Sequence, residues 1–71
     1  MSGTDAFQVE GVVLEVLSER TFRLELANGH RLLGFVSRKT RASQADLVPG
    51  RKVRLQLSPF DLSQGCILAA N

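Results

Sequence analysis

Hydrophobic and polar positions alternate along much of the chain, with the period of two that is typical of half-buried β-strands. The clearest example runs from Thr21 to Leu26, where every second residue is Phe or Leu. Residues 30–36 continue the alternation after Asn28-Gly29, a dipeptide that favours a tight hairpin because both residues tolerate positive φ. Residues 53–57 alternate in the same way, so we expect a fourth strand there, after a turn at Pro49-Gly50.

Three further segments complete the predicted order of elements. Residues 7–17 are rich in Val and Leu, and Gly11 within them indicates a bulge or a bend in a long first strand. Residues 37–47 break the alternation and are expected to hold a single helical turn, which a serine could cap. Residues 58–65 contain proline and glycine and are expected to form a loop before a short fifth strand at 66–69.

This order of elements predicts an all-β fold, a five-stranded Greek-key barrel of the OB type. The short helical turn between strands 3 and 4 favours the OB fold over an SH3-like barrel, which has similar strand content. A bent first strand also fits, because small barrels need a strand that turns a corner. We expect residues 7–71 to form one such domain and residues 1–6 to form a flexible N-terminal tail.

Length and composition narrow the class of protein. The chain has 71 residues, of which 44% are hydrophobic and 23% charged, as in small globular domains. Phe7 and Phe22 are expected to lie in the core. No apolar run is long enough to cross a membrane, and no basic and apolar leader precedes the first strand. We therefore expect a cytoplasmic protein without a membrane partner.

The residue types exclude most enzyme chemistry. The chain has one Cys and one His, so neither a disulfide nor a four-ligand zinc site can be assembled. Cys66 is expected to be a small half-buried residue, and His30 to have a surface or turn role, because no oriented partner for a general base is apparent. The glycines are scattered singly rather than grouped in a phosphate-binding loop. We expect no enzymatic activity, no cofactor and no metal.

Charge is distributed unevenly along the chain. Residues 1–30 carry two basic and five acidic residues, whereas residues 31–71 carry seven basic and two acidic ones. Residues 37–47, which link the third and fourth predicted strands, are called the connector here. Three cations lie within four of its residues, namely Arg38, Lys39 and Arg41. Such a cluster can contact phosphates, or it can simply keep the chain soluble, and the sequence leaves both interpretations open.

OB barrels bind single strands across the outward face of their middle strands, with help from flanking loops. We call this outward face of the middle strands the candidate RNA-binding platform. Four of the residues that it would carry are Arg23, Arg31, Leu33 and Phe35. Phe35 could stack on a base, although packing against the connector is the preferred interpretation. Phe60 lies in the loop before the last strand and could either stack on a base or close one end of the barrel.

Several longer runs resemble bacterial translation initiation factor 1, an S1-like OB-fold family. They are GVVLEVL at 11–17, TFRLELANGH at 21–30 and LSPFDLSQG at 57–65, together with the spacing of Ser37, Lys39 and Arg41. The resemblance implies a monomeric, non-enzymatic protein that binds the small ribosomal subunit near the aminoacyl-tRNA site. It further implies contacts with ribosomal RNA, a neighbouring ribosomal protein and the other initiation factors.

The resemblance also implies roles for individual residues. Lys39 and Arg41 would face RNA, Arg23 would belong to the platform, and Phe60 would replace a loop aromatic that is often Tyr. The chain departs from the family at Asp46, where a carboxylate would repel phosphate, and at residues 66–71, which lack the usual arginines. Arginines elsewhere restore part of the charge, at positions 31, 38, 51 and 54.

These departures leave two further hypotheses. A divergent paralogue could keep the barrel but bind another single-stranded RNA, or bind the ribosome only weakly. Alternatively, Leu33 and Phe35 could form an apolar surface for a protein partner. Salt separates the classes, because RNA binding weakens steeply with salt whereas apolar protein contacts do not.

Overall fold

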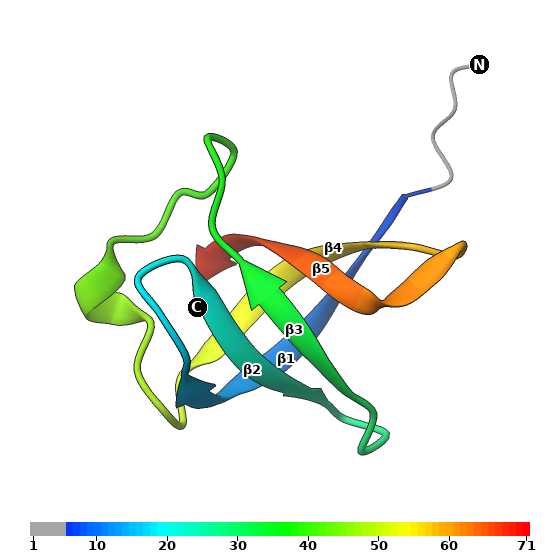
Figure 1. Cartoon of the computed structure of the whole chain (residues 1–71), viewed down its shortest axis with the longest axis horizontal. Helices are drawn as coiled ribbons and strands as arrows, with labels where there is room; N and C mark the ends of the chain where they lie inside the picture. The colour runs from blue at the N-terminus through cyan, green and yellow to red at the C-terminus, as the bar shows by residue number, and fades with distance from the viewer. Residues whose placement is uncertain (1–5) are drawn as a thin grey trace.

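The computed structural model describes residues 6–71, which form a closed five-stranded barrel and a short 3-10 helix (Figure 1). In chain order the elements are β1 (Phe7–Val16), β2 (Thr21–Leu26), β3 (Arg31–Phe35), η1 (Gln44–Asp46), β4 (Lys52–Ser58) and β5 (Asp61–Ala70). The order around the barrel is β1-β2-β3-β5-β4, with β3 and β5 parallel and the other pairs antiparallel. The predicted OB fold and its helical turn are confirmed, whereas most of the predicted tail, residues 1–5, lies outside the described residues.

The barrel interior is filled by the inward residues of the alternating strands. The buried hydrophobic residues are Val13, Phe22, Leu24, Leu32, Leu47, Val53, Leu55, Leu57 and Ile67. Phe22 is in this core, as predicted, but the prediction for Phe7 is wrong, because 40% of its surface is exposed. Phe7 begins β1 and pairs with β4 alone, since the pairing of β1 with β2 starts only at Gly11.

Strand β1 passes from one partner strand to another at its middle. Residues 7–12 pair with β4 and residues 11–16 pair with β2, so the two ladders overlap at Gly11 and Val12. A Cβ atom at Gly11 would lie 3.2 Å from the carbonyl oxygen of Glu25 and 3.3 Å from Leu55 Cδ2. The glycine therefore lets three strands approach closely, while the register irregularity itself lies slightly later, between Val13 and Glu15.

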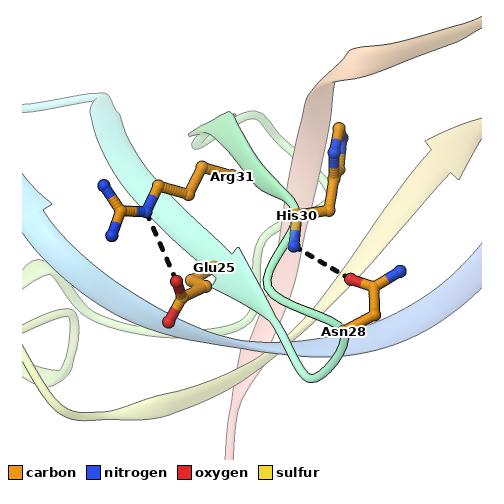
Figure 2. A network of polar contacts seen from close by, with 4 residues as sticks. All are labelled: Glu25, Asn28, His30 and Arg31. Carbon is orange, nitrogen blue, oxygen red and sulfur yellow. Dashed lines mark hydrogen bonds and ion pairs between the residues drawn. The ribbon is translucent and has the colours of Figure 1, made fainter.

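The β2–β3 hairpin forms where predicted, but its turn differs from a two-residue turn. The loop spans residues 27–30, closed by the Leu26 N–H donating to the His30 carbonyl at 2.8 Å. Only Gly29 has positive φ, at 87°, and Asn28 does not. The side-chain oxygen of Asn28 instead accepts the backbone N–H of His30 at 3.0 Å (Figure 2), which supports a wider loop.

Strand β5 begins earlier than the sequence predicts. The expected loop at 58–65 is instead a tight turn followed by the first half of a ten-residue strand. Residues 61–64 are all exposed, so this half of β5 carries no alternation that could reveal it. The parallel pairing of Leu33 with Gln64 and of Gly34 with Gly65 places this half of β5 beside β3.

Candidate nucleic-acid interface

The outward side of β2, β3 and β5 forms a continuous face beside the connector. The strand registers place Arg23, Leu33 and Gln64 side by side, and Thr21, Phe35 and Cys66 in the next row. Because inward neighbours on these strands are buried, the outward side chains have fixed directions. We name this surface the β3 face, and its members are Arg23, Arg31, Leu33, Phe35 and Gln64.

Both arginines of the β3 face already have acidic partners. Arg23 Nε lies 3.3 Å from Glu15 Oε1 on β1, and Arg31 Nε lies 3.3 Å from Glu25 Oε2 on β2 (Figure 2). The arginine side chains are 48% and 67% exposed, so these are surface ion pairs. Such pairs contribute about 0–1 kcal/mol, and a phosphate could therefore replace the carboxylate partner.

The connector between β3 and η1 forms a loop that stands out from the barrel (Figure 1). Its base is fixed to β5, because the Thr40 hydroxyl donates to the Ile67 carbonyl at 2.5 Å and the Arg41 N–H donates to the Leu68 carbonyl at 2.6 Å. Its tip is closed by Ser37 N–H donating to Thr40 Oγ1 at 3.0 Å. The connector is thus held as an extension of the sheet next to the end of β3.

The three connector cations differ from the arginines of the β3 face. Arg38, Lys39 and Arg41 are exposed, and none has an ion-pair partner within residues 6–71. Asp46, the acidic residue nearest along the chain, lies half-buried in η1, where its Oδ2 accepts the Ser43 hydroxyl at 3.0 Å. The connector therefore presents three positive charges that no ion pair within residues 6–71 neutralises.

Two grooves follow the β3 face and share Gln64. One, of about 410 Å³, is lined by Phe35 and Lys39 among other residues, and the other, of about 270 Å³, by Arg23 and Arg31. The structure thus brings Phe35 together with Lys39 in one groove, and Arg23 together with Arg31 in the other. Arg38, Arg41 and Phe60 line neither groove.

A carboxylate also lines the larger groove. The Ser63 hydroxyl donates to Asp61 Oδ1 at 2.5 Å, and the Ser63 N–H donates to the same oxygen at 3.0 Å. These hydrogen bonds lower the pKa of Asp61 below its ordinary value of 3.8 because they favour the charged form. The groove that holds Lys39 therefore also holds a fixed negative charge.

Both candidate aromatic residues face solvent. Phe60 lies in the β4–β5 turn with 83% of its surface exposed, so it does not close the end of the barrel. Phe35 is 36% exposed, and neither ring belongs to the residues packed against the core. Sequence reasoning missed Ser63 and Gln64, because the first half of β5 carries no alternating signal.

His30 and Cys66, the residues that could support catalysis or metal binding, both make hydrogen bonds within the fold. The ring Nε2–H of His30 donates to the Leu62 carbonyl at 2.8 Å, which ties the β2–β3 hairpin to β5. Cys66 is half-buried, as predicted, and its Sγ lies 3.1 Å from Ser37 Oγ. Among the described residues, no group of three or more His, Cys, Asp or Glu side chains could hold a metal ion. No helix in this part of the chain is long and apolar enough to cross a membrane.

The fold and this surface define a small OB-fold barrel with a basic loop beside an outward-facing sheet. Among solved structures, the chain is similar to translation initiation factor 1 from the Wolbachia endosymbiont strain TRS of Brugia malayi. The two are 30% identical over 94% of this chain and 79% of that chain, with a TM-score of 0.71. This similarity shows that the chain belongs to the translation initiation factor 1 family.

A second solved structure shares the fold alone. It is a copper(II)-bound variant of CusF from Escherichia coli, 13% identical over 100% of this chain and 95% of that chain, with a TM-score of 0.62. No protein-family model matches the chain.

Proposed function

We propose that this chain binds ribosomal RNA on the small ribosomal subunit, near the aminoacyl-tRNA site, and assists translation initiation without catalysing a reaction. The observation that carries the proposal is the connector, where Arg38, Lys39 and Arg41 are exposed cations without ion-pair partners among residues 6–71. Exposed Lys and Arg side chains supply the salt-dependent part of the affinity for a phosphate backbone. Membership of the initiation factor 1 family supports the ribosome as the partner.

We propose different roles for the connector and for the β3 face. The connector cations neutralise phosphates, while Phe35 lies in the adjoining groove, where it can stack on an unpaired base. Arg23 and Arg31 join by exchanging their carboxylate partners for phosphate oxygens. Phe60, at the exposed β4–β5 turn, supplies a second stacking contact outside the grooves.

The remaining features fit the other proposed partners. Leu33 and Leu62 are 39% and 45% exposed and offer apolar area to a neighbouring ribosomal protein or another initiation factor. We further propose that the protein acts as a cytoplasmic monomer.

The test is binding of labelled protein to purified bacterial small ribosomal subunits across a range of salt concentrations. We expect the affinity to fall steeply with salt, and unlabelled bacterial initiation factor 1 to compete for the site. Lys39→Gln combined with Arg41→Gln should weaken binding and flatten the salt dependence. The matched control is Lys39→Arg combined with Arg41→Lys, which keeps both charges. Normal binding by the neutralised variant would contradict the assigned residues.

The acidic residues beside the β3 face favour one alternative. Glu15 and Glu25 partner its arginines, and Asp61 lines its larger groove, so the surface is less positive than its arginines suggest. A divergent paralogue that binds another single-stranded RNA would bind RNA without competing with bacterial initiation factor 1. Salt-insensitive binding of a partner would instead indicate a protein-interaction surface.

A further inference from the structure

Ser43 differs from the other hydroxyl residues within residues 6–71 in the charge that precedes it. Three cations lie among the five residues on its N-terminal side, namely Arg38, Lys39 and Arg41. Thr40 has two such cations, and every other serine or threonine of this part of the chain has at most one. Protein kinases select substrates partly by the pattern of charge around the acceptor hydroxyl. Ser43 is therefore the candidate acceptor for a kinase that recognises a preceding basic run.

The structure leaves Ser43 accessible, whereas the hydroxyl of Thr40 is already engaged. Ser43 is exposed and lies immediately before η1, outside the strands of the barrel. The three connector cations that precede it are exposed as well. Thr40 is half-buried, and its hydroxyl donates to the Ile67 carbonyl at 2.5 Å. An enzyme that approaches from solvent can thus reach the basic run and the Ser43 hydroxyl together, and Thr40 is the poorer acceptor.

The Ser43 hydroxyl donates to an acidic side chain that follows it. Its Oγ lies 3.0 Å from Asp46 Oδ2, and the Ser43 carbonyl accepts the Asp46 N–H at 3.0 Å. These two hydrogen bonds close the turn of η1, directly before the buried Leu47. A phosphate ester on Ser43 has no hydroxyl proton to donate, and its charge would repel the Asp46 carboxylate. Phosphorylation therefore opposes the closed turn of η1.

A phosphate on Ser43 would also lie two residues from Arg41, within the connector itself. Phosphoserine carries about −1.5 to −2 charges at pH 7, and its three acceptor oxygens pair readily with arginine. No ion pair within residues 6–71 occupies the connector cations. The attached phosphate would compete with RNA phosphates for these cations as an intramolecular ligand, at an effective concentration of roughly millimolar.

We propose that Ser43 is a phosphorylation site, and that its phosphate releases the connector from RNA. The release rests on the proposed function, whereas the modification site itself does not. The enzyme is a serine/threonine protein kinase that recognises basic residues before its acceptor. The Ser43 Oγ bonds to the γ-phosphorus of ATP, the bond between that phosphorus and the β,γ-bridging oxygen breaks, and the hydroxyl proton passes to a base of the kinase. The products are phosphoserine and ADP.

The first measurement locates the phosphate. The protein is incubated with ATP, Mg²⁺ and a purified kinase of this class, and fragment-ion mass spectrometry identifies the modified residue. We expect Ser43 to be modified, Arg41→Gln to slow the reaction, and Arg41→Lys, which keeps the charge, to slow it less. Ser43→Asn can still donate a hydrogen bond to Asp46 but should take up no phosphate. Modification of Thr40 in place of Ser43, or no modification, would overturn the inference.

The second measurement compares the unmodified and phosphorylated proteins in binding to purified small ribosomal subunits across a range of salt concentrations. We expect phosphorylation to weaken binding at least about tenfold, because the added charge repels RNA. The log–log salt slope should flatten by up to about 1.4, the value for two phosphates of a single strand. Ser43→Asn should bind equally before and after incubation with the kinase. Equal affinities of the two forms of the unaltered protein would overturn the release.

Thermal unfolding separates the effect of charge from loss of structure. Phosphorylation should lower the unfolding midpoint through repulsion from Asp46, and Asp46→Asn should restore the midpoint of the phosphorylated protein while its salt slope stays flattened. Recovery of the slope together with the midpoint would overturn the competition for connector cations. Failure of the unmodified protein to bind subunits would contradict only the proposed function, because the mass spectrometry does not depend on RNA.

Discussion

Gly34 lies on β3 with its backbone directly over the core. A Cβ atom there would overlap Leu24 Cδ1 and would lie 2.9 Å from Leu24 Cγ and 3.2 Å from Ile67 Cγ1. Both neighbours are fully buried, so neither can move freely. We expect Gly34→Ala to lower the free energy of unfolding by about 1–3 kcal/mol through overpacking. Urea unfolding measures the loss, and Ala45→Ser, at an exposed position in η1, should leave the midpoint unchanged.

The pKa of the Asp61 carboxyl depends mainly on its hydrogen bonds with Ser63. Ser63→Ala removes the hydroxyl donor, so we expect the pKa of Asp61 to rise toward 3.8, whereas Ser63→Thr should keep it low. Because the pKa is lowered in the folded protein, Asp61 stabilises the fold above the unfolded pKa, and this stabilisation is lost as pH falls through the folded pKa. The carboxyl ¹³C chemical shift of Asp61, followed against pH, measures its pKa in each variant. An unchanged midpoint in Ser63→Ala would show that the backbone N–H suffices.

At the scale of elements, the connector depends on a neutral side chain to position its cations. Thr40 donates its hydroxyl to the Ile67 carbonyl and accepts the Ser37 N–H, which closes the loop that carries Lys39. Thr40→Val removes both hydrogen bonds but no charge. We expect RNA affinity to fall by about two- to tenfold, the equivalent of roughly one hydrogen bond, with an unchanged salt slope. Thr40→Ser should bind normally, and a changed slope in Thr40→Val would indicate that a phosphate contact had been lost.

The elements also show what the sequence could and could not predict. Strands β2 and β4 are alternating and half-buried, so their bounds and inward faces were predictable from Phe22, Leu24, Val53 and Leu55. The first half of β5 was not, because it buries none of its residues before Gly65. For the same reason, the sequence did not predict Ser63 and Gln64 as members of the candidate site. Parallel pairing between segments distant in the chain produces no periodic pattern in the local sequence. The roles of the predicted RNA-binding residues stay predictions.

At the scale of the whole molecule, folding redistributes the charge asymmetry of the chain. Glu25 from the acidic first half lies next to Arg31 from the basic second half, and Glu15 pairs with Arg23 within the first half. Cations without ion pairs within residues 6–71 gather instead on the connector and at the start of β4. The acidic partners therefore limit how strongly the β3 face attracts RNA, and removing one of them is a direct test.

Glu25→Gln releases Arg31 from its carboxylate partner while keeping the size of the side chain. We expect RNA to bind more tightly, because Arg31 no longer has to leave a carboxylate partner when it contacts a phosphate. The log–log salt slope should steepen by up to about 0.7, the value for one phosphate of a single strand, because no freed carboxylate takes up a cation in exchange. Stability should change by less than about 1 kcal/mol, because the ion pair lies at the surface. Glu25→Asp keeps a carboxylate beside Arg31 and should keep the original affinity and slope. Equal slopes in the two variants would show that Arg31 does not contact RNA, and the β3 face would then bind through Phe35 and the connector alone.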